Sequence, residues 1–128
     1  MKFSISLTDL ERLLKNSGVS KAKTADSFIL SACAARVFVE FKGDVAGLEG
    51  VVLADGAVTL PAKKFAALLK TYKGTKLLTC NGGPNGLKVQ NFTMPVLAWN
   101  PHPAPPADFQ VFPVTNPGIV APSPEPRR

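Results

Sequence analysis

A strand that runs directly into an amphipathic helix is the unit that most constrains this chain. Residues 56–73 read GAVTLPAKKFAALLKTYK, in which Val58 and Leu60 alternate as on one face of a strand. Pro61 follows them, and proline suits a helix start because the N–H that it lacks would have no partner there. The next residues carry a single apolar helical stripe, formed by Phe65, Leu68, Leu69 and Tyr72. The segment therefore predicts a strand and a helix that each pack through one face.

The same unit stands 55 positions earlier, which indicates an internal repeat. Shifting the chain by that distance lays Phe3, Ile5, Leu10, Leu13, Leu14 and Lys15 over Val58, Leu60, Phe65, Leu68, Leu69 and Lys70. Ser6 takes the place of Pro61, and Asp9 three residues later completes a pattern typical of a helix start. We infer a duplication with repeats at about residues 1–55 and 56–100. The alternative is two unrelated copies of a common motif.

Strand-like segments follow each helix. We predict strands over residues 28–34, 36–42 and 45–54 in the first repeat, and over residues 75–80, 87–90 and 92–99 in the second. Gly47 and Gly50 indicate a bend or bulge within the third of these strands, and Pro95 suits an edge strand or a bulge. Residues 81–86, NGGPNG, predict a hairpin turn rather than a phosphate-binding loop, because no helix follows them.

Positive charge is concentrated in the second repeat. The 128 residues include 15 Lys or Arg and 9 Asp or Glu, a formal net charge of +6. Residues 1–55 carry seven of each sign, whereas residues 56–100 carry six lysines and no acid. Such a run is typical of a surface that binds a polyanion, and equally of a solvated surface with no partner.

The residues that active sites require are sparse. His102 is the only histidine, so neither a catalytic triad nor a histidine metal site can be assembled. Asp9 and Glu11 are expected on the outward side of the first helix as solvated acids. Cys33 and Cys80 lack a CxxC spacing and are expected to be buried free thiols. The sequence thus predicts no enzyme activity, no cofactor and no metal.

The sequence also bears on location and on the end of the chain. It contains no leader pattern and no run of apolar residues long enough for a membrane span, so we expect a cytoplasmic protein with no membrane partner. Nine of the 12 prolines lie between residues 101 and 126. We therefore expect a domain over residues 1–109 and a proline-rich tail over residues 110–128. Within the proline-rich stretch that begins at Pro101, the apolar groups of residues 108–109 and 111–112 are expected to pack back on the rest of the domain.

Three short motifs and the repeat carry a resemblance to a known family. After the opening MKFSISLTDLERLL, they are Val58-Thr59-Leu60-Pro61-Ala62, Phe92-Thr93-Met94-Pro95 and Pro106-Ala107-Asp108-Phe109. Over residues 1–109 the chain resembles the first domain of the bacterial DNA polymerase III sliding clamp (the beta subunit). The resemblance implies an α+β DNA-clamp (processivity) fold, with two β-α-βββ repeats and two helices side by side on one face of antiparallel sheets.

The chain departs from this family in domain number. A clamp subunit has three such domains and a ring has six, whereas this sequence contains one and a tail. The groove that takes partner peptides belongs largely to the third domain of the family, so that function is not carried over. Ring formation is therefore a separate question from the fold.

The resemblance implies a non-enzymatic DNA-binding protein, a processivity or tethering factor whose helices face duplex DNA. The residues that would contact DNA are Arg12, Lys15, Lys63, Lys64, Lys70 and Lys73. Lysines suit sliding because flexible point charges attract phosphates without reading bases. Self-association into a ring and contacts with replication or accessory proteins are compatible with this hypothesis. One alternative is a clamp-derived interaction module, an adaptor or inhibitor of such a complex that does not encircle DNA, and another is a structural protein that kept only the fold.

Overall fold

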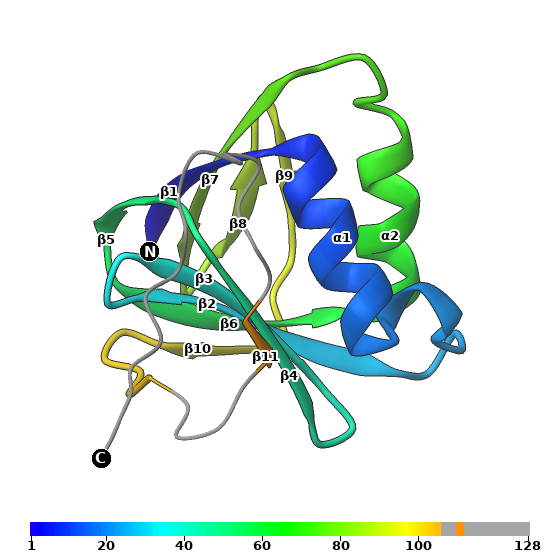
Figure 1. Cartoon of the computed structure of the whole chain (residues 1–128), viewed down its shortest axis with the longest axis horizontal. Helices are drawn as coiled ribbons and strands as arrows, with labels where there is room; N and C mark the ends of the chain where they lie inside the picture. Colours follow the sequence, from blue (N-terminus) through cyan, green and yellow to red (C-terminus); the bar gives the residue numbers. More distant parts are fainter. Residues whose placement is uncertain (106–109, 112–128) are drawn as a thin grey trace.

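Each half of the chain folds into a strand, a helix and a run of further strands (Figure 1). The structure is a computed structural model that describes residues 1–105 and 110–111. The first half comprises β1 (Lys2–Ser6), α1 (Leu7–Ser17), the 3₁₀ helix η1 (Val19–Lys21), β2 (Ser27–Cys33), β3 (Arg36–Phe41), β4 (Asp44–Glu49) and β5 (Val51–Ala54). The second comprises β6 (Gly56–Pro61), α2 (Ala62–Lys70), β7 (Leu77–Gly83), β8 (Gly86–Val89), β9 (Phe92–Met94) and β10 (Ala98–Asn100), and β11 (Gln110–Val111) follows.

The two halves interlock in two sheets. The five-stranded sheet has the order β5-β1-β7-β8-β9, and the six-stranded sheet has the order β10-β6-β2-β3-β4-β11. The counterparts in the two halves are β1 and β6, β2 and β7, β3 and β8, β4 and β9, and β5 and β10. Replacing each strand of the five-stranded sheet by its counterpart gives β10-β6-β2-β3-β4, which is the order of the six-stranded sheet without β11. All neighbouring strands are antiparallel except β11, which runs parallel to β4. The predicted α+β fold with two related repeats is therefore confirmed.

The first helix begins where Ser6 and Asp9 predict, and it ends at a glycine. α1 starts at Leu7, 55 positions before the start of α2 at Ala62. The Asp9 N–H donates to the Ser6 hydroxyl over 3.0 Å, which satisfies one of the free N–H groups of the first turn. Gly18 ends the helix with a φ of 91°, a conformation that glycine adopts without steric cost.

The second helix is shorter than its apolar stripe suggests. α2 ends at Lys70, so Tyr72 lies in the turn that follows and not on the helix. The Tyr72 hydroxyl donates to the Val89 carbonyl over 2.8 Å, which ties this turn to β8. Tyr72 thus packs against the core as the stripe predicts, but from a turn and not from a helix.

The last predicted strand of each half crosses from one sheet to the other. The bend expected at Gly47 or Gly50 is confirmed at Gly50, which separates β4 in the six-stranded sheet from β5 in the five-stranded sheet. Gly47 instead lies within β4, where it pairs regularly with Phe38. A Cβ at Gly50 would stand 3.1 Å from Val37 Cγ2, so a larger residue would crowd the bend. The prediction of one strand over residues 92–99 is wrong, because the chain leaves β9 at Pro95 and pairs again only as β10.

The turn predicted over residues 81–86 is a tight hairpin. β7 extends through Gly83 and β8 begins at Gly86, so Pro84 and Asn85 alone form the turn. The hairpin-turn prediction is confirmed with longer strands than expected.

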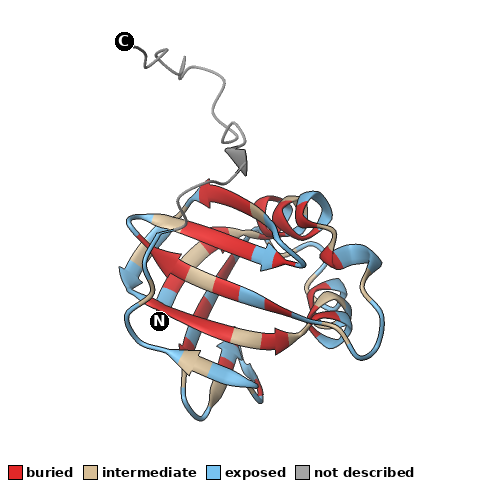
Figure 2. Cartoon of the chain, turned by 90° about the horizontal axis from the view of Figure 1, so that it is seen from below, coloured by how far each residue is buried: buried red, intermediate tan, exposed pale blue. Residues whose placement is uncertain are grey.

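The core lies between the sheets and the helices, where the strands turn one face inward (Figure 2). The apolar stripes of both helices are buried in it, including Leu10 and Leu13 of α1 and Phe65 and Leu69 of α2. The rings of Phe65 and Phe28 have centroids 5.3 Å apart, which joins α2 to β2. Both helices are thereby fixed on the same side of the molecule.

The backbone of β11 lies on the edge of the six-stranded sheet. Gln110 pairs with Ala46 and Val111 with Gly47. The first two residues of the predicted tail therefore belong to a sheet, and the tail residues 112–128 and the predicted contacts of residues 108–109 and 112 lie outside the described residues.

Candidate nucleic-acid interface

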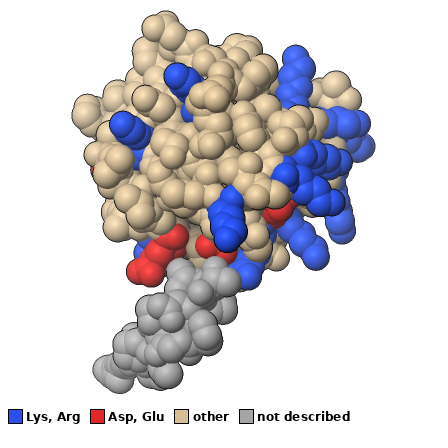
Figure 3. All heavy atoms as spheres, turned by 90° about the horizontal axis from the view of Figure 1, so that it is seen from above, with Lys and Arg blue, Asp and Glu red and all other residues tan. Residues whose placement is uncertain are grey.

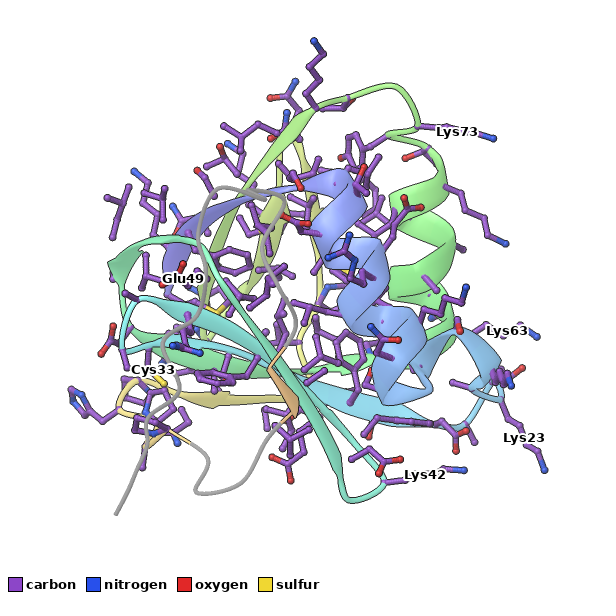
Figure 4. The ribbon with its side chains drawn as sticks, viewed as in Figure 1. Lys23, Cys33, Lys42, Glu49, Lys63 and Lys73 are labelled. Atoms are coloured by element: carbon purple, nitrogen blue, oxygen red, sulfur yellow. The ribbon has the colours of Figure 1, made fainter. Side chains whose placement is uncertain are left out.

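Helices α1 and α2 lie side by side and carry all but one of the predicted DNA-contacting residues (Figure 1). Arg12 and Lys15 are on α1, Lys63, Lys64 and Lys70 are on α2, and Lys73 is in the turn after α2. The five lysines are exposed and Arg12 is half-buried. Figure 4 shows Lys63 and Lys73 pointing away from the sheets on the outer side of α2. The fold therefore brings the two sets of cations together on one side of the molecule.

Helical periodicity explains why these side chains reach solvent. Phe65 and Leu69 are buried against the core, so positions on the opposite side of α2 must point outward. Lys63 and Lys70 occupy such positions and are exposed. The same core-facing stripe that anchors the helix thus orients its lysines.

Lys23 extends this surface, although it is not among the residues predicted to contact DNA. The preceding 3₁₀ helix η1 contacts both α1 and α2, and Figure 4 shows Lys23 on the same side of the molecule as Lys63. Val19 at the start of η1 is buried, which holds the loop against the helices. No periodic pattern in the sequence marks this position, because it depends on tertiary packing. We call Arg12, Lys15, Lys23, Lys63, Lys64, Lys70 and Lys73 the basic face.

Asp26 organises the loop below the basic face. Its carboxylate accepts the Lys23 backbone N–H over 2.8 Å and lies 3.4 Å from Lys42 Nζ. The hydrogen bond from the Lys23 backbone, and then the charge of Lys42, hold the pKa of Asp26 below its usual range. Lys42 points to the same side as Lys63 (Figure 4), but its ion pair with Asp26 offsets its charge.

The two acids of α1 differ in their surroundings. Glu11 is exposed and lines a small hollow between the helices together with Lys70, so it is an acid beside the basic face. Asp9 was expected on the outward side of α1, and this prediction is wrong because Asp9 is 9% exposed. It lines a hollow with Ser4 and Gly50, where the bend between β4 and β5 covers the start of α1.

Groups for catalysis or metal binding are not gathered in the described residues. No cluster of three or more His, Cys, Asp or Glu side chains occurs among residues 1–105. Cys33 and Cys80 are buried free thiols, as predicted. Burial raises the pKa of Cys80 to about 12, and burial followed by the charge of Asp55 raises the pKa of Cys33. Both thiols are therefore protonated and poorly nucleophilic at neutral pH.

The helices of the described residues are also too short or too polar to cross a lipid bilayer.

Comparisons with known proteins identify the architecture. No protein-family model matches the sequence, and no curated protein matches it. A Helicobacter pylori beta clamp bound to a DNA ligase peptide is similar in structure, with a TM-score of 0.63 and 21% identity over 77% of this chain and 30% of that chain. A C. crescentus beta sliding clamp is similar with a TM-score of 0.53 and 17% identity over 84% of this chain and 33% of that chain.

The chain thus spans about a third of the length of these two clamps. Identities this low establish a shared fold and no more. In this chain the fold consists of two sheets, two adjacent helices and mixed α and β structure. The protein therefore has the fold of a bacterial beta sliding clamp domain.

Proposed function

We propose that this protein is a non-enzymatic, clamp-like protein that binds duplex DNA through the basic face, without reading base sequence. The observation that carries the proposal is the placement of the acid-free run of residues 56–100. Four of its six lysines lie on α2 or the turn after it, beside the cations of α1. Figure 3 shows Lys and Arg gathered on the side of the molecule where the helices lie.

The chemistry of the basic face suits phosphates more than bases. Exposed lysines attract the DNA backbone as flexible point charges, which gives affinity without register. Binding to single-stranded bases uses exposed aromatic rings for stacking. α2 carries one aromatic residue, Phe65, and it is buried, whereas α1 carries none.

Replacing Lys63, Lys64 and Lys70 together by glutamine tests the proposal. Each lost phosphate contact should reduce the slope of log Kobs against log salt by about 0.9, so the triple variant should lose up to about 2.7. The measurement is fluorescence anisotropy of a labelled duplex titrated with protein between about 50 and about 200 mM salt.

A matched control removes Lys2 and Lys88, which are exposed on the five-stranded sheet. Lys2 on β1 and Lys88 on β8 both pair with Asn81 on β7. These side chains are on the outer side of the sheet, because the neighbouring Phe3 and Cys80 are buried on its inner side. Their replacement by glutamine should leave the slope nearly unchanged. An unaltered slope in the triple variant, or an equal loss per charge in the control, would refute the basic face as the DNA site.

We further propose that several copies assemble on DNA, as the clamp fold suggests. This domain covers about a third of each clamp that it resembles, so an assembly of their length would combine several such domains. The sheets offer edges at β5, β9 and β10 through which a second copy could continue them.

The solution mass of the full chain tests assembly, measured by light scattering with and without duplex DNA. A closed oligomer on DNA is the expected result. A monomer that ignores DNA would reject both assembly and DNA binding, and would favour the interaction module.

A further inference from the structure

An ion pair lies at the edge of the basic face. The Asp26 carboxylate is 3.4 Å from the Nζ atom of Lys42, which belongs to the turn between β3 and β4. Figure 4 shows Lys42 pointing to the same side of the molecule as Lys23 and Lys63, two members of the basic face. Lys42 therefore lies where a cation would extend the basic face, but with an acid beside it.

Asp26 is fixed by three hydrogen bonds. Its carboxylate accepts the Lys23 N–H over 2.8 Å, and its own N–H donates to the Lys23 carbonyl over 3.0 Å. Its carbonyl accepts the N–H of Ala62, the first residue of α2, over 3.0 Å. The carboxylate is thus held in relation to both the loop of Lys23 and the start of α2.

The ammonium group of Lys42 has a second fixed neighbour, an aromatic ring. Its Nζ atom lies 5.3 Å from the centroid of the Phe41 ring, a distance at which the face of a ring attracts a cation. Phe41 is buried, and its ring lies beside Gly18 at the end of α1. The ring and the carboxylate therefore both favour the observed position of the ammonium group, although the Lys42 side chain is 61% exposed.

The carboxylate weakens the attraction of Lys42 for a phosphate. Coulomb energy varies as 1/r, so a phosphate oxygen about 3 Å from the ammonium on its far side, and about 6 Å from the carboxylate, would lose about half of the attraction. At larger distances the two opposite charges of the pair cancel almost completely. By contrast, Lys63, Lys64 and Lys70 form no ion pair with an acid of the described residues.

The Asp26 carboxyl group is ionised at neutral pH. The hydrogen bond from the Lys23 backbone lowers the pKa of Asp26 most, and the charge of Lys42 lowers it further. Since a carboxyl group is charged above its pKa, the negative charge beside Lys42 is present wherever the protein would meet DNA under physiological conditions.

We propose that Asp26 is an internal competitor of the DNA phosphates, which cancels much of the charge of Lys42 and so limits the number of phosphate contacts that the basic face makes. The proposal rests on the proposed function, because it concerns how tightly the same surface binds duplex DNA. Asp26 is a positioning residue in this account, since it acts through Lys42 and contacts no phosphate itself. The pair lowers the affinity for DNA, which favours movement along the duplex over tight binding.

Asp26→Asn tests the proposal. The side-chain carbonyl of asparagine can still accept the Lys23 N–H, but the charge opposite Lys42 is gone. Lys42 then makes a full phosphate contact, so the slope of log Kobs against log salt should become steeper by up to about 0.9. The affinity for a labelled duplex at about 100 mM salt, measured by fluorescence anisotropy, should rise at least about threefold.

Lys42→Gln, made in both backgrounds, measures the coupling between the two residues. In the Asp26→Asn chain it should reverse the gain in slope. In the wild-type chain it should change the slope by less than half as much, because Asp26 already offsets the Lys42 charge there. An equal effect in both backgrounds would show that Lys42 binds phosphate regardless of Asp26, and would overturn the proposal.

Two control variants separate the charge of Asp26 from other effects. Asp26→Glu keeps the charge but alters the hydrogen bond to the loop, so its slope should stay near that of the wild type. Glu49→Gln removes an exposed acid at the far end of β4, on the opposite side of the molecule from Lys42 (Figure 4), and should also leave the slope nearly unchanged. If either control gained as much slope as Asp26→Asn, the loop or the net charge would be the cause and the proposal would be wrong.

The outcomes distinguish this proposal from the proposed function. A wild-type chain and an Asp26→Asn chain that both fail to bind the duplex would reject the two together. If the triple variant of Lys63, Lys64 and Lys70 loses slope while Asp26→Asn matches the wild type, the basic face remains the DNA site and the role of Asp26 is rejected.

Discussion

Phe65→Ala is expected to lower the free energy of unfolding by about 3 to 5 kcal/mol, the usual cost of removing a buried aromatic side chain. Phe65 is fully buried on the inner side of α2, and its ring lies 5.3 Å from that of Phe28. The truncation removes apolar contacts, leaves a cavity and ends the aromatic pair that joins α2 to β2. Guanidinium chloride denaturation, followed by circular dichroism, measures the loss.

Phe92→Ala is the matched control for this prediction. The same atoms are removed from β9, but Phe92 is 51% exposed, so the loss should be about 1 kcal/mol. Should Phe65→Ala cost no more than Phe92→Ala, α2 would not be packed as described, and its lysines would not be fixed in place.

Gly56→Ala is expected to lower the free energy of unfolding by about 1 to 3 kcal/mol through overpacking. A Cβ at this position would stand 2.6 Å from Met1 Cβ and 2.7 Å from Trp99 Cη2. These distances are shorter than carbon atoms tolerate, so β1 or β10 must move away from β6. Because Trp99 is the only tryptophan, its fluorescence should report the displacement in the folded state as well as the unfolding transition.

Gly83→Ala is the matched control for Gly56→Ala, because it is the same substitution at a different glycine. A Cβ at Gly83 would meet no atom within 4 Å, and its φ lies outside the left-handed region. This variant should be neutral or more stable by up to about 1 kcal/mol, because alanine restricts the unfolded chain. Equal destabilisation by the two variants would contradict the close packing at Gly56.

Local signals made much of the fold predictable. The repeat follows from residue types at a fixed offset, and the start of α1 follows from Ser6 and Asp9 because capping acts within one helical turn. The hairpin turn at Ala34 and Ala35 had no such signal. Both residues have positive φ, 53° and 61°, without the glycine or asparagine that usually marks this turn.

Sheet membership was less accessible from the sequence. A run such as residues 92–99 has the same local pattern whether it stays in one sheet or crosses to another. The crossing after Met94 depends on pairing with residues distant in sequence, as when Trp99 pairs with Val58. Long-range pairing of this kind leaves no mark within the strand itself.

The candidate site was predictable where helical periodicity governs it. Lys63 and Lys70 could be placed opposite the buried stripe from sequence alone. The position of Lys23 depends on the contact of η1 with the helices, and the burial of Asp9 depends on the bend at Gly50.

The interlocked sheets also set the order in which the protein can fold during its synthesis. Phe3 of β1 pairs with Cys80 of β7, which lies 77 positions later in the chain. A ribosome adds about 5 to 20 residues per second, so β1 waits about 4 to 15 s for this partner. Until then the nascent first half has uncovered apolar surface, and its completion requires slow, non-local pairing. The newly made chain therefore passes through a stage in which its exposed apolar surface would be bound by chaperones.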